Sequence, residues 1–329
     1  MKSVEYVLRQ PQAEATRAVP AVRVRPPNAW VLLYDLISSQ IAIGELRKAV
    51  RLAWRAVRSP VSTLRWMGAL ERIRVRAGVE TVPYVLARKA AQPFLHHSMP
   101  QAAAINLLTT HYERLLVKLG SEFVGRLLRG EVIVLAQIKG RSTVRYRLCL
   151  AQSFLNPREG ELIVHLERVD EMKRVASLSL VVGAVDPGGP PDLWLGGLQG
   201  CRDADGKAVT VRATRDMWGL RPKDLLIHAA YALGDILGAA SLKAISNAGH
   251  RRHSLKYELV GWHADYDAFW RELGGAPIAG DFFLLPKVRH RRSVEEVPPD
   301  KRSAWRARYA LVDEIGADIR RLAVERGAG

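Results

Sequence analysis

The pattern of apolar residues changes at Glu131, and this change limits the chain to a mixed fold. Before it, apolar residues recur every three to four positions, as over Ala102–Arg129, which is the period of an amphipathic helix. After it come short β-rich segments such as Val132–Ile138, separated by breakers that contain glycine or proline. The pattern predicts an α+β protein, in which an all-helical region precedes a mixed β-sheet with helices.

Four segments follow from these patterns. Residues 1–27 are basic with little periodicity, which predicts a flexible N-terminus. Residues 28–130 form the helical region, 131–290 an α/β domain, and 291–329 a C-terminal helix. Residues 29–57 are predicted to be helical with a basic outer face. Such a helix either packs as an ordinary core helix or lies on a membrane surface.

The order of elements after Glu131 resembles the acyl-CoA-dependent N-acetyltransferase fold. Four antiparallel strands, a strand, a helix, a strand, a helix and a strand are expected at 132–138, 142–150, 161–166, 176–182, 193–198, 222–237, 242–246, 264–273 and 281–285. In the fold that this order resembles, the donor pyrophosphate lies at the N-terminus of the helix that follows the central strand. Gly219–Lys223 stands there, without the glycine-rich signature of that fold.

Charge and composition point to an anionic partner. The 329 residues carry a net charge of +17, dominated by arginine, which suits phosphates and carboxylates. Nucleic acid such as tRNA, an anionic membrane and a phosphorylated cofactor all fit, as does a merely solvated basic surface. The sequence shows neither a signal peptide nor an apolar run of about 20 residues. We expect a cytoplasmic protein without a transmembrane segment, able to contact the inner membrane peripherally.

The start of the helix at Pro222 is the candidate donor site. Proline suits the first helical turn, and free N–H groups there attract anions. Arg221 and Lys223 add positive charge, Arg215 precedes them, and Gly219 begins the segment that would anchor the donor. The alternative is a helix start with solvated basic residues.

Three polar residues at strand ends are the candidate catalytic residues. His250 could act as a general base, and the basic residues that follow it favour its neutral form. Asn247 could stabilise an oxyanion, or could simply cap a turn. Gln199 could bind a substrate amide, beside glycines that let a backbone or ligand approach.

Metal and hydrolase sites are weakly supported. His96, His97 and His111 lack a matching carboxylate spacing. His263 and Asp265 with His290, or Ser246 with His250 and Asp265, are short strings without a defining motif. We therefore expect no metal.

Six short sequence segments, together with the helical segment 107–116, resemble the VirK/YbjX family of bacterial proteins. They occupy residues 193–200, 212–214, 219–226, 244–250, 266–275 and 282–286, in the same order. The resemblance implies a role in bacterial virulence and in resistance to cationic antimicrobial peptides through the cell envelope. It implies no particular reaction.

Two functions of different classes follow. The first is an N-acyltransferase-like enzyme that modifies an amine of a peptide, lipid or protein, with acyl-CoA or aminoacyl-tRNA as donor. The second is a non-enzymatic envelope factor that binds anionic lipid or a protein partner through its basic helices. They are distinguished by whether His250, Asn247 and Gln199 converge on one pocket next to Arg221.

Overall fold

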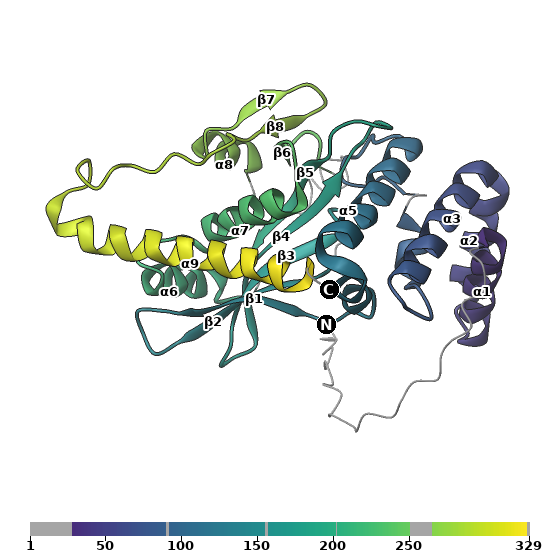
Figure 1. The fold of residues 1–329 in the computed structure, drawn as a ribbon, viewed down its shortest axis with the longest axis horizontal. Coiled ribbons are helices and arrows are strands. Elements are labelled where there is room, and N and C mark those ends of the chain that lie inside the picture. Colours follow the sequence, from purple (N-terminus) through teal and green to yellow (C-terminus); the bar gives the residue numbers. More distant parts are fainter. Residues whose placement is uncertain (1–27, 90–91, 155–156, 202, 251–264, 328–329) are drawn as a thin grey trace.

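A computed structural model describes residues 28–89, 92–154, 157–201, 203–250 and 265–327. The expected basic N-terminus at 1–27 and the basic residues Arg251, Arg252 and His253 lie outside this part. Within it, the expected order of helices followed by a mixed sheet is confirmed (Figure 1). The helices before Glu131 are α1 (Ala29–Ala42), α2 (Leu46–Arg58), α3 (Pro60–Arg76), α4 (Tyr84–Ala87) and α5 (Gln101–Leu128).

The predicted continuous helix over 29–57 is in fact two helices, α1 and α2. The chain turns at Gly44, whose φ of +77° is a left-handed conformation that glycine adopts without steric cost. The Asn28 side chain accepts the Trp30 N–H at 3.0 Å and so caps the start of α1. The two helices pack against each other and against α3.

The described residues form an eight-stranded sheet in the order β1-β2-β3-β4-β5-β6-β8-β7. Strands β1 to β5 are an antiparallel meander, and β6 then pairs parallel to β5 after a crossover that contains α7 (Pro222–Leu237). The hairpin of β7 and β8 closes the sheet, with β8 beside β6. The strands are Ile133–Lys139, Arg145–Gln152, Leu162–Arg168, Lys173–Gly183, Asp192–Gly200, Leu242–Ile245, Ala276–Ile278 and Phe282–Leu284.

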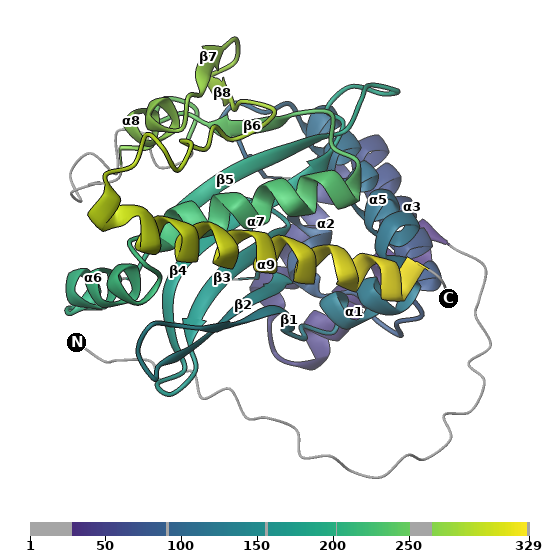
Figure 2. The same ribbon diagram turned by 60° about the vertical axis from the view of Figure 1, so that its left-hand side comes forward.

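Three helices cover one face of the sheet. α7 (Pro222–Leu237) and α9 (Arg302–Gly327) lie side by side across it, and α5 packs against both (Figure 2). Alternate side chains such as Leu148, Val164 and Leu178 point to these helices and are fully buried. One hydrophobic core therefore runs through the helical region and the sheet.

Some elements were missed or misplaced by the sequence patterns. Helix α6 (Gly206–Asp216) begins with glycine and is rich in β-branched residues, yet burial of Val209 and Ala213 holds it in place. The last helix begins at Arg302 rather than 291, because Pro298 and Pro299 exclude helix before them. Helix α8 (Tyr266–Glu272) was predicted.

Candidate active site

A cavity of about 440 Å³ lies at the N-terminus of α7. The start of α7, the end of β5, helix α6 and helix α8 all contribute to its wall. The lining residues are Val175, Ala176, Gly200, Thr210, Arg221, Pro222, Lys223, Asp265, Ala268, Phe269 and Glu272. Two of the four predicted donor-site residues, Arg221 and Lys223, therefore face one cavity.

The two cationic side chains that line this cavity, Arg221 and Lys223, differ in whether a carboxylate neutralises their charge. Arg221 is held by Asp224 at 2.7 and 3.1 Å and by Glu272 at 2.6 and 3.1 Å, and the Asp224 hydrogen bond raises the pKa of Arg221. Lys223 pairs with no carboxylate in the described part of the chain, and burial, together with Arg221, lowers its pKa. Lys223 thus supplies the positive charge that a bound anion would neutralise.

Gly219 and Arg215 do not line the cavity. Gly219 has a φ of +81°, and a Cβ there would collide with Arg308, which donates to the Trp218 carbonyl at 2.9 Å. The backbone turn therefore accounts for this glycine. Arg215 is exposed in the last turn of α6. The donor-binding roles of both residues stay predictions.

The parallel strands β5 and β6 separate beside this cavity. They pair only at Leu193–Leu195, after which β5 bulges at Gly196 and Gly197 and runs on to Gly200 along β4 alone. At the opening, the Leu198 N–H donates to the hydroxyl of Tyr266 at 3.0 Å. Tyr266 stands between the cavity residues Asp265 and Ala268 in the sequence of α8.

The carboxylate of Glu159 packs on the bulge. A Cβ on Gly196 would overlap the Glu159 carbonyl, and one on Gly197 would overlap its carboxylate, so only glycine fits at either position. Glu159 accepts the Gln199 amide at 3.1 Å, and its other oxygen lies 3.9 Å from His250 Nε2. We call Glu159, Gln199 and His250 the buried polar cluster.

His250 is 2% exposed and packs edge-to-face on Tyr266, with ring centroids 5.3 Å apart. The basic residues that follow it lie outside the described part of the chain. Among the described residues, the Glu159 carboxylate lies beside His250, 3.9 Å from Nε2. A carboxylate at this distance favours the imidazolium, so Glu159 would stabilise the cation formed when His250 takes a proton.

Asn247 does not join the buried polar cluster. Its side chain donates to Asp265 at 2.9 Å and accepts the Tyr266 N–H at 2.9 Å, while its own N–H donates to Asp267 at 2.7 Å. These bonds fasten the turn after β6 to the first turn of α8. Asn247 is placed to position Tyr266, and its role at an oxyanion stays a prediction.

The convergence that was expected of the three catalytic candidates is therefore partial. His250 and Gln199 meet on Glu159, Asn247 does not, and none of the three lines the cavity beside Arg221. The cluster and the cavity adjoin through Gln199, which precedes the cavity residue Gly200, and through Tyr266. The sequence analysis did not single out Glu159. Its signal in the sequence is the pair Gly196 and Gly197, because no larger residue would leave room for Glu159.

The residues of the weakly supported hydrolase and metal candidates make other contacts. Ser246 Oγ accepts the Gly249 N–H at 3.0 Å, and Asp265 caps α8 by accepting the Ala268 N–H at 3.0 Å. His263 lies outside the described residues.

A row of polar side chains crosses the face of the sheet opposite α7. Cys149, His165, Ser177 and Gln199 are directly paired across β2, β3, β4 and β5, so the row leads to the buried polar cluster. Burial, with a contribution from Arg174, lowers the pKa of His165 to about 4. The signal in the sequence is that side chains alternate between the two faces of β3. His165 therefore lies on the face opposite that of the leucines of the strand.

Among the described residues, three groups of side chains have donor atoms close enough together for a cation. Cys149, His165 and Glu167 form one, with donor atoms within 4.8 Å. Arg147 already pairs with Glu167 at 2.8 Å, and burial raises the pKa of the Cys149 thiol to about 11. Both effects oppose a cation, and the group is better suited to neutral polar contacts.

The second group is Cys201, Asp203 and Asp205, where Lys173 already pairs with the two carboxylates at 3.2 and 2.6 Å. The third group is His96, His97 and Asp281. His96 Nδ1 accepts the Ser98 N–H at 3.1 Å, so Nε2 carries the proton and points to Asp281 at 3.5 Å. His111 lies apart in the core, where it accepts the Val182 N–H at 3.2 Å. The three histidines of the helical region therefore do not form one site.

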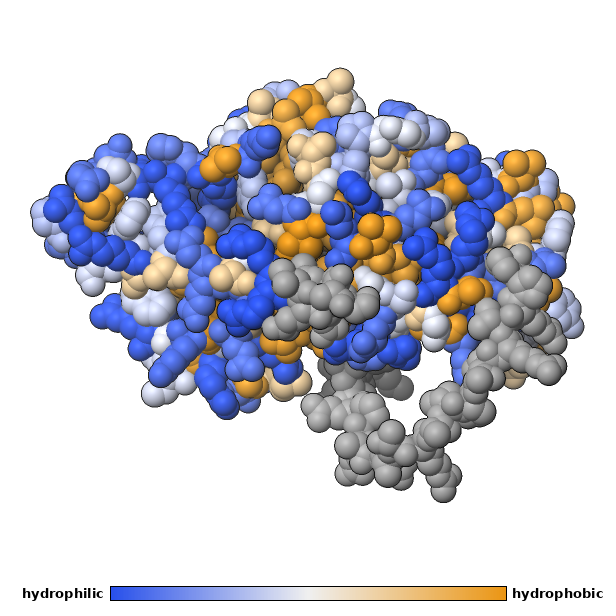
Figure 3. Space-filling model, in the orientation of Figure 1, coloured by the Kyte–Doolittle hydropathy of each residue, from blue (hydrophilic) through white to orange (hydrophobic). Residues whose placement is uncertain are grey.

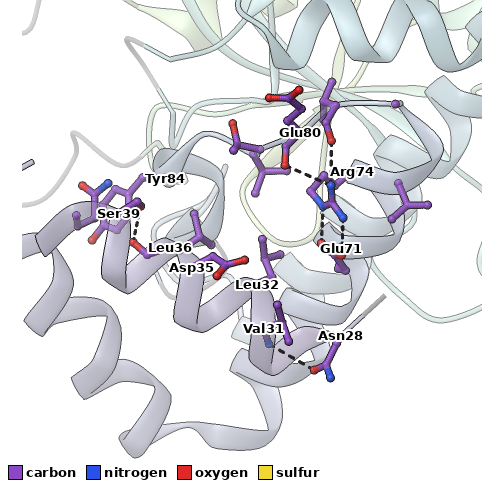
Figure 4. Close-up of a pocket in the computed structure, with 16 residues that line it drawn as sticks. Asn28, Val31, Leu32, Asp35, Leu36, Ser39, Glu71, Arg74, Glu80 and Tyr84 are labelled. Carbon is purple, nitrogen blue, oxygen red and sulfur yellow. Dashed lines mark hydrogen bonds and ion pairs between the residues drawn. The ribbon is translucent and has the colours of Figure 1, made fainter. Parts of the chain in front are cut away.

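The groove between α1 and α3 is larger, about 610 Å³, but has the opposite charge (Figure 4). Asp35, Glu71 and Glu80 line it, and its arginine, Arg74, is held by Glu71 at 2.7 and 2.8 Å. An anionic donor is therefore better matched to the cavity at α7 than to this groove.

Acid is expected to destabilise the fold through its buried histidines. Burial lowers the pKa of His111 to about 3 and that of His165 to about 4, both below the ordinary value of 6.5. The unfolded chain therefore binds more protons than the folded one below pH 6.5. The stability from each neutral histidine is complete above pH 6.5 and is lost as the pH falls toward its folded pKa.

Urea unfolding at pH 7, 6, 5 and 4.5 measures this effect. Each histidine contributes a slope of up to about 1.4 kcal/mol per pH unit. His165→Asn should flatten the dependence, whereas His290→Gln, at an exposed position, should leave it unchanged. If the free energy of unfolding of His165→Asn had the same pH dependence as that of the wild type, the lowered pKa assigned to His165 would be wrong.

Comparison with known proteins places the chain in a family. The sequence model of DUF535, described as a protein of unknown function, matches residues 42–321. The chain is 27% identical over 263 residues to the uncharacterized protein YbjX of Escherichia coli (strain K12), covering 79% of each chain. It is 26% identical over 206 residues to an uncharacterized protein of Haemophilus influenzae, covering 62% of this chain and 66% of that one. No solved structure matches. The expected VirK/YbjX resemblance is thereby confirmed, and the chain belongs to the DUF535 family.

Proposed function

We propose that the protein is an N-acyltransferase-like enzyme, which transfers an acyl group from an anionic donor to an amine of a peptide, lipid or protein. One observation carries the proposal. The opening between β5 and β6 has the cavity lined by Lys223 on its α7 side and the Glu159–His250 pair on its other side, outside that cavity. A donor and a base could therefore meet across one gap in the sheet.

The arrangement of the sheet supports this proposal. An antiparallel meander, a crossover helix, a parallel strand, a second helix and a closing hairpin resemble the acyl-CoA-dependent N-acetyltransferase fold. In that fold the donor pyrophosphate lies at the N-terminus of the helix corresponding to α7. The free N–H groups and the dipole of α7 attract an anion at this end, beside Lys223.

Each step of acyl transfer has a candidate residue. His250 takes a proton from the attacking amine, and Glu159 stabilises the resulting imidazolium. The amine nitrogen bonds to the acyl carbon as the bond to the donor's sulfur or oxygen breaks. Tyr266, whose hydroxyl lies at the strand opening, is the candidate donor of a proton to the leaving group.

Acyl-CoA and aminoacyl-tRNA both carry the phosphates that this site would bind, and the net charge of +17 suits either. Mass spectrometry of small molecules that copurify with the full chain would identify the donor. Product formation should then be followed with acyl-CoA or aminoacyl-tRNA and primary-amine acceptors. An absence of transfer from both donor classes would count against the proposal.

Lys223→Gln is expected to weaken donor binding without unfolding the protein. Losing one charge-assisted contact costs about 1.5–3 kcal/mol, or roughly a 10- to 150-fold rise in Kd. Calorimetric titration with coenzyme A and with aminoacyl-tRNA measures it. Lys207→Gln, at an exposed site on α6, is the matched control. Arg221→Ala tests the site less cleanly, because it also breaks the contacts of Arg221 with Asp224 and Glu272.

The alternative, a non-enzymatic factor acting through the basic helices, involves a separate part of the molecule. α1 and α2 contribute no residue to the buried polar cluster or to the cavity at α7. No helix among the described residues has the length and apolarity to cross a bilayer. Peripheral contact with the inner membrane is therefore compatible with the transferase proposal.

A further inference from the structure

Helix α2 leaves a stripe of large apolar side chains in solvent. Leu46, Val50, Trp54 and Val57 are 60, 57, 59 and 81% exposed, although Ala49 and Leu52 of the same helix are buried. With 3.6 residues per turn, positions four, four and three residues apart fall on one side of a helix. α2 therefore has a buried side facing its neighbours and a second apolar side that is largely exposed to solvent.

A row of arginines runs beside this stripe, displaced by one residue. Arg47, Arg51, Arg55 and Arg58 each follow a member of the stripe. None pairs with a carboxylate within the described ranges, and Arg58 lies over the Trp54 ring at 5.0 Å. Four unneutralised cations thus border the apolar stripe along its length.

The apolar surface continues beyond both ends of α2. Ile41 and Ile43 at the turn from α1 are 53 and 68% exposed, and Val61 at the start of α3 is 79% exposed. In Figure 3, hydrophobic side chains gather at the right-hand end of the molecule, over α1 to α3, among hydrophilic ones. An apolar surface of this extent normally marks an interaction site.

We propose that α2 docks on an anionic lipid bilayer, lying in the plane of its surface. The stripe of Leu46, Val50, Trp54 and Val57 would enter the boundary between headgroups and acyl chains, and the arginine row would contact anionic headgroups. At 13 residues, α2 is too short to span the bilayer. Trp54 suits the interface, because its ring is apolar and its N–H is polar.

The chemistry of the surface distinguishes a bilayer from other occupants. A nucleic acid would neutralise the arginines but would leave the aliphatic side chains in water. A second copy of α2 would cover the stripe but would bring two arginine rows together. An anionic bilayer satisfies both features at once. This inference does not depend on acyl transfer, since the cavity at α7 and the buried polar cluster lie elsewhere in the fold.

Vesicle cosedimentation of the full chain tests the proposal. The protein should bind vesicles of phosphatidylcholine mixed with phosphatidylglycerol and should bind phosphatidylcholine alone at least about tenfold more weakly. Arg47→Gln with Arg51→Gln should weaken binding to the anionic vesicles by about 30-fold. Lys301→Gln with Arg306→Gln removes the same charge from another exposed surface and should change binding little.

The stripe is tested separately with Trp54→Ser plus Val57→Ser, which should weaken binding to anionic vesicles at least about tenfold. Val117→Ser plus Val288→Ser is the control, since these valines are 67 and 78% exposed elsewhere. Melting temperatures establish that each variant folds. In Trp54→Phe, quenching of tryptophan fluorescence by brominated lipid should fall.

Three results would overturn the proposal. The first is equal binding to neutral and anionic vesicles, and the second is unchanged binding of the stripe variant. The third is a wild-type protein that is dimeric and does not bind vesicles, together with a stripe variant that is monomeric. A second copy of the chain would then be the occupant of the stripe.

Discussion

Replacing His250 with glutamine in the full chain is expected to slow amine acylation by about 100- to 10,000-fold, or about 3–5 kcal/mol of transition-state stabilisation. Glutamine keeps much of the size of the imidazole but cannot accept a proton at neutral pH. Glu159→Gln should slow the reaction as well, because the amide retains contact with Gln199 but cannot stabilise an imidazolium. Both effects should be measured as single-turnover rates with saturating donor.

The structure changes what is expected of stability in this variant. A histidine in a turn would ordinarily pack little, and the melting temperature would then stay constant. His250 is instead 2% exposed and packs on Tyr266, so a lower melting temperature is expected along with the slower rate. Rates must therefore be measured well below the melting transition of the variant.

The pH profile separates catalysis from folding in this experiment. Loss of the base should remove the limb of the rate profile that reports its deprotonation, whereas a merely destabilised protein would keep the shape of the profile. His97→Gln, at an exposed histidine near the same loop, is the matched control. Wild-type turnover in a folded His250→Gln protein would exclude His250 from the reaction.

Replacing Lys89 with methionine is expected to cost about 3–5 kcal/mol of the free energy of unfolding. Lys89 donates to both oxygens of Glu161, at 2.8 and 2.7 Å, and Glu161 is fully buried. The variant leaves this carboxylate without its cation, with hydrogen bonds from Tyr112 at 3.2 Å and Gln152 at 2.8 Å. Urea unfolding at pH 7 measures the loss.

A double-mutant cycle assigns the cost to the unpaired charge. Lys89→Met with Glu161→Gln should be less destabilised than Lys89→Met alone, because the second change removes the buried charge. Arg126→Met, which breaks the partly exposed pair with Glu131, should cost at most about 1 kcal/mol. Additive costs in the double variant would contradict an ion pair between Lys89 and Glu161.

The Lys89–Glu161 pair also affects the candidate active site. It ties the segment after α4 to the segment that carries Glu159, two residues before Glu161. Lys89→Met is therefore expected to slow acyl transfer by displacing Glu159 from His250, even where the protein remains folded. This would make Lys89 a positioning residue, since it does not contact the buried polar cluster itself.

The sequence by itself determined the elements whose signals lie among near neighbours. α7 begins and ends as predicted, because Pro222 suits a first turn and Gly238 adopts the left-handed conformation that ends a helix. The change in the spacing of apolar residues at Glu131 separated helices from strands, because it too is a signal among near neighbours. The Gly44 turn was missed because the apolar period continues across it, although glycine itself permits the left-handed turn. α6 was missed because burial of Val209 and Ala213 outweighs its weak helix propensity.

Only the tertiary structure decided the composition of the candidate site. Strand pairing brings Gln199 into the row with His165, and the bulge at Gly196 and Gly197 makes room for Glu159 beside His250. Side chains alternate along a strand, so a shift of one residue would send Gln199 to the opposite face. The register that prevents this shift comes from pairing between segments far apart in the chain, which a local sequence pattern does not contain.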